Sequence, residues 1–492
     1  MHLRQLVRGG LSNLTGWIAT FAASFVCWAI LARELGVASL GVYGFALWLS
    51  STFTALATLG LPFTTEKNIG SALGRNDLKD ALFFSKKLLK VQFLIAFGMT
   101  LVSIPVQRVV APHGDQTIAL LVAATVIPSS LQIALRSIFS GLHRFGLANS
   151  ISVVAAVLQL IFVIGAKELQ GGVYLMLGAN LLASVVAVAI SFRQFGRLGS
   201  KMSADSIASK QSGSSEVLWK FSLSFSYIAL LEYILWDKSE VFFLQRLSTY
   251  EQIAFYTLAF AAAAKLIIVA QSFADTMLPI AARTFSHSSM TGLAAMFFDA
   301  NRMMLLVLVP LSAAAAILAK PFLLLFCGKQ FGPAVGPLEV LLAGIPIASL
   351  SSVGWAVIAA ANHESYLAKG MTTGAVVSIV ADFFLIRHYG ALGAAIATTV
   401  AQIFVAVLFL WLAVKVTRSR FPWGTLWRSY VGSGLAFAPA FLARSNTFAF
   451  CSAACVGCAL YPIVMWLLKE FKMQELRSAM STLLVRDDPT PS

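Results

Sequence analysis

Charged residues are scarce in this chain. Asp, Glu, Lys and Arg make up 12% of its 492 residues, whereas hydrophobic residues make up 58%, and the mean hydropathy is +0.81. A soluble domain normally carries roughly a quarter charged residues, because its water-facing surface must be largely polar. This deficit excludes a string of soluble domains and predicts a membrane protein.

Acidic residues are scarcer than basic residues. The chain has 21 Asp and Glu against 36 Lys and Arg, a formal net charge of +15. In a soluble protein such an excess would suggest nucleic-acid binding. Membrane proteins, however, concentrate Lys and Arg in their cytoplasmic loops. The excess therefore indicates membrane orientation, and no nucleic-acid partner is expected.

The chain also has little of what catalytic and metal sites require. Three of its five cysteines lie in the apolar run AFCSAACVGCALYP, where cysteine usually acts as a small hydrophobic residue. The six histidines avoid the centres of the apolar runs, and no Gly-Lys-Ser/Thr phosphate loop is found. We therefore expect no enzyme, no catalytic residue, no metal and no bound cofactor. Energy would come from substrate flux or from a proton or sodium gradient.

Long apolar runs, by contrast, fill the sequence. A membrane-spanning helix needs about 20 mainly apolar residues. Such runs predict an all-α, polytopic fold with about 14 spans. The predicted spans are 11–32, 40–62, 88–111, 117–140, 147–166, 172–193, 217–236, 252–281, 303–326, 335–361, 366–386, 391–414, 426–443 and 447–468.

The loops between these spans are short, and the longest covers about 196–216. Most of the 36 lysines and arginines fall in the loops that share a side with both termini. Because Lys and Arg are enriched on the cytoplasmic side, both termini are predicted to be cytoplasmic.

Short motifs in the first half of the chain are repeated in the second half. Tyr43, in GVYGFA, is matched by Tyr256, in AFYTLA, and Pro62 is matched by Pro279 at a similar offset. These matches predict two pseudo-symmetric six-helix bundles followed by two extra helices. Such halves are typical of transporters that handle substrate at the cleft between them. The predicted domains are 1–200, 201–418 and 419–492.

Several glycine-rich motifs resemble those of a known family. They are LARELG at 31–36, LGVYG at 40–44, LGLP at 59–62, QFGPA at 330–334 and YGALGAAIAT at 389–398. From about Leu6 to Val416 the chain resembles bacterial polysaccharide and O-antigen flippases of the multidrug/oligosaccharidyl-lipid/polysaccharide (MOP) exporter superfamily. The glycines of the first two motifs permit a tight turn and close helix approach between the first two spans.

This resemblance implies a flippase that moves a polyprenyl-diphosphate-linked oligosaccharide across the bacterial inner membrane by alternating access. Its partners would be that substrate, membrane lipid and the polysaccharide polymerase or export machinery. The alternatives are a multidrug or small-metabolite exporter of the same superfamily, or a lipid II-type flippase. A membrane enzyme would need a large external loop, and a structural subunit of an export complex would tolerate mutation of Lys265.

Lys265 is the most conspicuous cation, because it lies inside the apolar stretch AFAAAAKLIIVAQSF. Ionisable residues within a span are costly and are functional candidates by default. In a flippase for a diphosphate-linked glycan, Lys265 would offset the negative charge of the diphosphate; a snorkelling or salt-bridged lysine is the alternative. Arg33, Lys67 and Arg283 are further substrate-binding candidates. Their alternative roles are interfacial anchoring or a gate, at the outer side for Arg33 and at the cytoplasmic side for Lys67 and Arg283.

Three acidic residues are candidates for coupling transport to an ion gradient. Asp275 and Asp382 lie within predicted spans, and Glu66 follows the second span. A carboxylate in any of these places would bind a proton or a sodium ion if a gradient drives transport.

Other polar residues are expected to be structural. Glu232, Asp237 and Glu240 are predicted to form a solvated edge at the outer end of the seventh span. The amides within spans are predicted to hydrogen-bond between helices, with lining of a sugar path as the alternative. These amides are Gln132, Gln159, Asn180 and Gln402.

Overall fold

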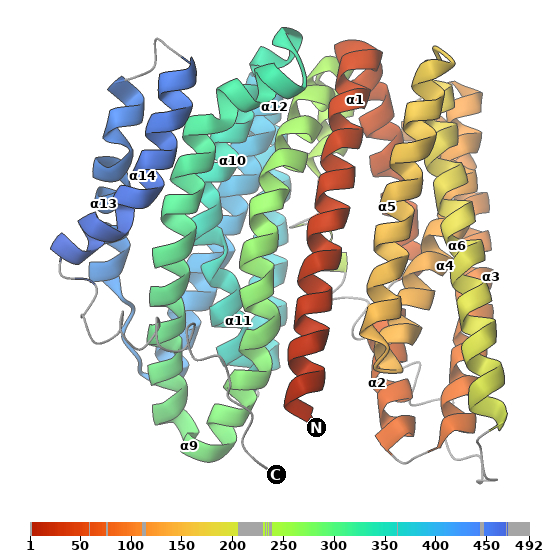
Figure 1. The fold of residues 1–492 in the computed structure, drawn as a ribbon, viewed down its shortest axis with the longest axis horizontal. Coiled ribbons are helices and arrows are strands. Elements are labelled where there is room, and N and C mark those ends of the chain that lie inside the picture. The colour runs from red at the N-terminus through yellow and green to blue at the C-terminus, as the bar shows by residue number, and fades with distance from the viewer. Residues whose placement is uncertain are drawn as a thin grey trace. The chain divides into compact units, whose positions relative to one another are not determined.

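The protein is all-α over the residues that its computed structural model describes (Figure 1). The structure describes residues 2–58, 60–74, 77–110, 115–204, 239–361, 363–442 and 447–468, together with Leu230, Leu231, Tyr233, Leu235 and Glu470. Within these ranges, eight helices are long and apolar enough to cross a membrane. The chain is therefore a multi-pass membrane protein, as its composition predicts.

The chain packs as two compact units. Unit 1 comprises Met1–Leu258, Phe326–Ala334 and Ala375–Ala394. Unit 2 comprises Ala259–Leu325, Val335–Gly374 and Ala395–Ser492. The division into 1–200, 201–418 and 419–492 stays a prediction.

Unit 1 holds most of the N-terminal helices and short pieces of two later ones. A core among α2, α3, α4 and neighbouring helices buries Ile69, Leu135, Ile138 and Phe139 completely. Helix α8 and the first turns of α9 complete the unit, with η1 and the central part of α12. The bounds are α1 His2–Thr58, α2 Leu61–Gly74, α3 Leu78–Val110, α4 Gln116–Gly141, α5 Phe145–Glu168, α6 Val173–Ala204, α8 Glu240–Leu247, α9 Tyr250–Phe326, η1 Lys329–Ala334 and α12 Glu364–Thr417.

Two of the longest helices are each divided by a glycine. In α1, Gly36 has φ 69° and ψ 177°, and in α12, Gly390 has φ 53° and ψ −127°. A side chain with a Cβ atom is disfavoured at positive φ, so glycine suits both positions. At the second turn, the backbone N–H of Ala391 donates to Gln252 Oε1 at 2.9 Å. Each glycine therefore separates two predicted spans within one continuous helical stretch.

Unit 2 contains the remainder of α9 and most of the C-terminal helices. Helix α9 has 77 residues, which at 1.5 Å per residue would reach roughly 115 Å if straight. Figure 1 shows α9 reversing direction at the bottom of the view, so it accommodates the predicted spans 252–281 and 303–326. The remaining bounds are α10 Val335–Ala348, α11 Leu350–Ala360, α13 Trp423–Leu442 and α14 Thr447–Leu467.

The predicted spans agree well with these helices. Helices α10 and α11 together cover the span at 335–361, while α13 and α14 coincide with the last two. The span predicted at 217–236 lies almost entirely outside the described residues. Every other predicted span lies in helical backbone over nearly its whole length.

Candidate functional site

Two carboxyl groups are buried in unit 1. Glu240 begins α8 and is 1% exposed, and Asp382 lies in α12 and is 0% exposed. The prediction that Glu240 belongs to a solvated edge was wrong. It opens the short apolar helix EVFFLQRL, whose Val241 and Leu244 are fully buried, so packing of this helix carries the carboxyl group inside. Its predicted neighbours Glu232 and Asp237 lie outside the described residues.

A tyrosine from a third element holds Glu240. The hydroxyl of Tyr256, in the second turn of α9, donates to Glu240 Oε2 at 2.8 Å, and the tyrosine is fully buried. Asp382 is close enough to Glu240 for the two carboxyl groups to interact electrostatically. Two consecutive helices, α8 and α9, and the distant α12 therefore contribute two acids and one phenol to the same region.

Asp382 itself has no hydrogen-bond partner within the described part of the chain, at either carboxyl oxygen. The hydroxyl of Ser378, one helical turn earlier on α12, is equally without a partner there and is 1% exposed. Buried polar atoms are nearly always hydrogen-bonded, so an exception calls for an explanation. We call Glu240, Tyr256, Ser378 and Asp382 the acid site.

The acid site has the chemistry of a cation site. Two buried carboxylates of like sign repel each other, and burial of either charge without a compensating group is costly. A shared proton, or a cation held by carboxyl and hydroxyl oxygens, would remove both costs. No group of three or more His, Cys, Asp or Glu side chains with metal-binding spacing occurs among the described residues.

The predicted substrate-binding cations lie in several elements. Lys265 is half-buried in α9. Arg33 is exposed near the turn of α1, and its Nε donates to the carbonyl of Phe326 at 2.8 Å. Lys67 is in α2 and Arg283 is in α9, but their side chains lie outside the described residues. Their role in binding substrate stays a prediction.

Of the three acids predicted to couple ions, only Asp382 belongs to the acid site. Glu66 lies on the surface of α2, where desolvation by neighbouring atoms raises its pKa and the charge of Arg136 opposes that rise. Asp275 lies in α9, and its side chain is outside the described residues. Nothing in the sequence pairs Asp382 with Glu240, because the two are far apart in the chain. The apolar run that follows Glu240 is the one feature of the sequence that indicates its burial.

Polar contacts in unit 1 match two other expectations. Gln159 Nε2 on α5 donates to Asn180 Oδ1 on α6 at 3.2 Å, which confirms the predicted interhelical role of this pair. Glu34 forms an exposed ion pair with Lys167 at 3.2 Å. An exposed ion pair of this kind is consistent with an interfacial role for Arg33 and the adjacent Glu34.

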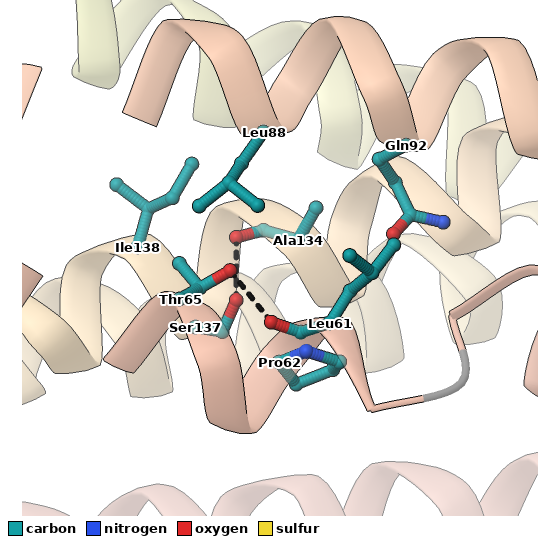
Figure 2. Close-up of a pocket in the computed structure, with 8 residues that line it drawn as sticks. All are labelled: Leu61, Pro62, Thr65, Leu88, Gln92, Ala134, Ser137 and Ile138. Carbon is teal, nitrogen blue, oxygen red and sulfur yellow. Dashed lines mark hydrogen bonds between the residues drawn. The ribbon is translucent and has the colours of Figure 1, made fainter. Parts of the chain in front are cut away.

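A small cavity lies where α2, α3 and α4 meet (Figure 2). Its polar side chains are already used within the protein. Thr65 donates to the carbonyl of Leu61 at 2.7 Å, Ser137 donates to the carbonyl of Ala134 at 2.9 Å, and Gln92 donates to the carbonyl of Ala57 at 2.9 Å. The cavity therefore offers few free groups to a ligand, unlike the acid site. Its lining residues are Leu61, Pro62, Thr65, Leu88, Gln92, Ala134, Ser137 and Ile138.

Comparison with known proteins places the chain in a family. Residues 6–285 match the family described as "Polysaccharide biosynthesis protein", which is more than half of the sequence. The chain belongs to this family. A similar curated protein is the probable low-salt glycan biosynthesis flippase Agl15 of Haloferax volcanii, 20% identical over 441 residues, or 88% of this chain and 89% of the relative.

Solved structures identify the fold. The lipid II flippase MurJ in an inward closed conformation matches with a TM-score of 0.66 at 15% identity, over 94% of this chain and 99% of MurJ. An inward-facing MATE-family multidrug transporter of the MOP superfamily matches equally well, with a TM-score of 0.66 at 14% identity, over 83% of this chain and 98% of that one. The MOP fold indicated by the sequence motifs is thereby confirmed, and the two structural relatives are a flippase and a multidrug transporter.

Proposed function

We propose that this member of the polysaccharide biosynthesis protein family is a cation-coupled flippase. The observation that carries the proposal is the acid site, a pair of buried carboxyl groups within a MOP fold, in which the oxygens of Asp382 have no hydrogen-bond partner among the described residues. If Asp382 had only a structural role, we would expect its oxygens to be hydrogen-bonded or an apolar residue to occupy its place. A transporter, in contrast, needs a site that is complete only when the driving ion is bound.

The proposed cargo is a polyprenyl-diphosphate-linked oligosaccharide, moved across a bacterial inner membrane with both termini of the protein in the cytoplasm. Support comes from the family description, from the printed name of the glycan flippase of Haloferax volcanii and from the fold shared with a lipid II flippase. Lipid-linked glycan would be the main partner, and a polysaccharide polymerase or export complex would receive it. The protein itself would catalyse no covalent step.

In the proposed cycle, ion binding changes the balance between inward- and outward-facing states. An ion shifts that balance only if its affinity differs between the two states. Asp382 and Glu240 would hold a proton or a sodium ion with help from Ser378 in one state, and would release it in the other. The diphosphate would be met by cationic side chains. The candidates are Lys265, Arg33, Lys67 and Arg283, while Asp275 and Glu66 stay candidates for a second coupling group.

A second candidate function is export of drugs or small metabolites. It is favoured by the MATE transporter, which matches with the same TM-score as MurJ, and by the acid site, which would serve cation-driven export equally well. A lipid II-type flippase is a third variant of the same mechanism. These alternatives differ in cargo and share the ion site, so a test of the cargo separates them.

The test is deletion of the gene, followed by measurement of lipid-linked oligosaccharide in the membrane and of polymer at the cell surface. We expect the lipid-linked glycan to accumulate and the surface polymer to disappear, and wild-type protein to restore both. Lys265→Ala should fail to restore them, whereas Lys320→Ala should succeed, because Lys320 is an exposed lysine of the same helix. Unchanged amounts of lipid-linked glycan, in a strain without a second flippase, would contradict the proposed cargo and favour export of drugs or metabolites.

A further inference from the structure

The connection between α12 and α13 is strongly basic. From Trp411 to Tyr430 the chain reads WLAVKVTRSRFPWGTLWRSY, which holds four cations and no acidic residue. The whole segment lies in unit 2. The proposed transport cycle uses none of these residues. The four cations are Lys415, Arg418, Arg420 and Arg428.

The centre of this segment is a short, well-defined turn. Helix α12 ends at Thr417, and Arg418 adopts the left-handed conformation with φ 52° and ψ 30°. The hydroxyls of Thr417 and Ser419 lie 2.8 Å apart, and the N–H of Trp423 donates to the carbonyl of Phe421 at 2.9 Å. Left-handed backbone favours glycine over residues with a Cβ atom, yet arginine occupies the position. We call Thr417–Trp423 the basic turn.

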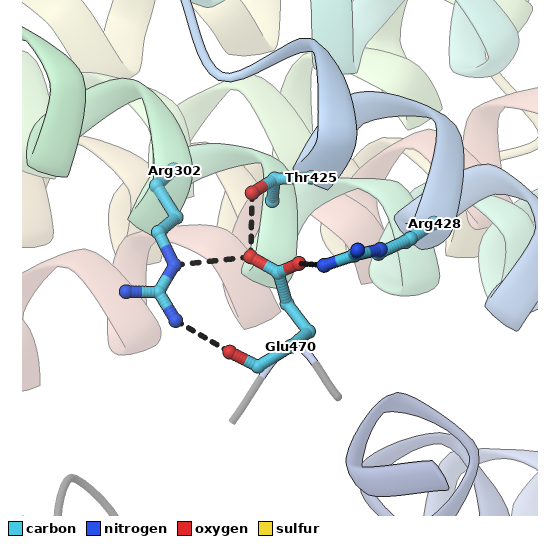
Figure 3. Close-up of polar contacts among 4 residues, drawn as sticks. All are labelled: Arg302, Thr425, Arg428 and Glu470. Atoms are coloured by element: carbon cyan, nitrogen blue, oxygen red, sulfur yellow. Dashed lines mark hydrogen bonds and ion pairs between the residues drawn. The ribbon is translucent and has the colours of Figure 1, made fainter. Parts of the chain in front are cut away.

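One of the four cations is already matched by an acid. Arg428 Nη1 lies 3.0 Å from Glu470 Oε2, and Arg302 Nε lies 3.0 Å from Glu470 Oε1 (Figure 3). Thr425 donates to the same carboxylate at 2.5 Å, and Arg302 Nη2 donates to the backbone carbonyl of Glu470 at 2.6 Å. We call these four residues the clasp. It fixes the first turn of α13 beside the basic turn.

The other three cations are not matched in this way. Lys415, Arg418 and Arg420 are exposed, and none of them forms an ion pair with a residue that the structure describes. Lys415 Nζ lies 5.3 Å from the centre of the Trp411 ring. Three exposed positive charges therefore lie within six residues of sequence with no acid among them.

Large aromatic side chains flank these charges. Trp411 is 57% exposed, Trp423 is 70% exposed and Trp427 is 60% exposed. Exposed tryptophans at the ends of membrane helices lie at the level of the lipid headgroups. Clustered Lys and Arg at that depth attract anionic lipids. A free anion in water would require the charges but not the tryptophans.

We propose that the basic turn, together with Lys415, Trp411 and Trp427 beside it, binds the phosphate headgroup of an anionic phospholipid. The three unmatched cations would supply the charge complementarity, and the indole rings would rest at the headgroup level. The proposal does not depend on the cargo that the protein transports. It gives the cations of this connection a role in lipid binding in addition to their effect on membrane orientation.

Native mass spectrometry of bound lipid tests this proposal. The full-length protein in neutral detergent is titrated with phosphatidylglycerol or with phosphatidylcholine. We expect Arg418→Gln/Arg420→Gln to weaken phosphatidylglycerol binding about ten-fold and to leave phosphatidylcholine binding unchanged. Lys320→Gln/Lys369→Gln removes the same charge from exposed lysines elsewhere in unit 2 and should bind like wild type. Equal binding by the wild type and the arginine double variant would overturn the proposal.

Two further arms identify the ligand. Inorganic phosphate and pyrophosphate at millimolar concentration should leave the bound phosphatidylglycerol in place, and displacement by either would indicate a free-anion site instead. Displacement by a polyprenyl diphosphate at equimolar concentration would assign the turn to the transported cargo and overturn the proposal. If the double variant folds poorly, Arg418→Gly replaces it. That change removes the charge and suits the left-handed backbone, so weaker lipid binding without a lower melting temperature is the expected result.

Discussion

The protein buries carboxyl groups in two very different ways. In unit 2, the side chain of Glu470 is 5% exposed, and its oxygens meet Arg302, Arg428 and Thr425. In unit 1, Asp382 is completely buried, and neither of its oxygens has a partner among the described residues. The carboxyl group of Glu470 is surrounded by donors. That of Asp382 lacks them and interacts electrostatically with a second acid, Glu240.

The difference separates a structural group from a functional one. A buried carboxylate that is fully matched ties helices together, and its removal leaves buried cations behind. Burial acts to raise the pKa of Glu470, but hydrogen bonds from Thr425, Arg428 and Arg302 outweigh it and hold the pKa below its usual value. A buried acid without donors gains nothing from its charge until an ion arrives. The acid site should therefore govern activity, and the clasp should govern stability.

The largest expected effect is the loss of transport in Asp382→Asn. The amide keeps the shape of the carboxyl group but removes the charge that would hold the driving ion, so transport should fall by about 100-fold or more. The melting temperature should be equal to or higher than that of the wild type, because a neutral group costs less to bury. Complementation of the deletion strain and thermal unfolding in detergent measure the two quantities.

The matched control for this variant is Glu470→Gln, another buried carboxyl group turned into an amide. Its transport per folded molecule should remain near the wild-type value. If Asp382→Asn transports normally, or if both variants lose transport to the same extent, the division between a functional acid and a structural acid is wrong.

The next effect is the loss of stability in Glu470→Ala. Two guanidinium groups and one hydroxyl lose their shared acceptor, and α13 loses its tie to α9. Because the side chain of Arg428 is 40% exposed and that of Arg302 is 22% exposed, water replaces part of the interaction. We expect a cost of about 2 kcal/mol, below that of a fully buried pair. An unchanged unfolding midpoint would contradict a structural clasp.

Much of the fold is predictable from the sequence because a bilayer imposes simple rules. Runs of about 20 apolar residues have to be helices, since no water is present to satisfy an exposed backbone. The turns at Gly36 and Gly390 lie within motifs whose glycines signal tight backbone geometry. Hydropathy alone does not predict that α9 is continuous through the loop between two spans.

The acid site is predictable only in part. Asp382 stands out because an ionisable residue within a span is unusual. Glu240 lies in a charged stretch at the end of a span, where exposure is the usual outcome, and only long-range packing brings it beside Asp382. The sequence gives no signal for the burial of Glu470 either, since an acid just after the last apolar run is usually solvated. Residue type and depth are local properties of the sequence, but the partner of a side chain is not.

A smaller effect should follow from removing one hydroxyl donor from each carboxyl group. Tyr256→Phe takes the hydrogen bond from Glu240, and Thr425→Val takes one from Glu470. Each loses about 1 kcal/mol of hydrogen bonding, but the outcomes should differ. Tyr256→Phe should shift the ion concentration needed for half-maximal transport several-fold, whereas Thr425→Val should lower only the unfolding midpoint. A shift of ion dependence in Thr425→Val would make the clasp part of the transport mechanism.

The smallest expected effect is the pH dependence of the clasp, because protonation removes the charge of Glu470 and leaves its shape. Glu470 lies beyond the end of α14, and its pKa is lower in the folded protein than in the unfolded chain. Its charge therefore contributes stability in full above the unfolded value of about 4.3, and that contribution disappears as the pH falls through the folded pKa. The difference in melting temperature between the wild type and Glu470→Gln should be constant from about pH 8 to pH 6 and should narrow below about pH 4.5. A difference that widens as the pH falls would mean that the pKa of Glu470 is higher in the folded protein than in the unfolded chain, and Glu470 would then not be a carboxylate stabilised by its donors.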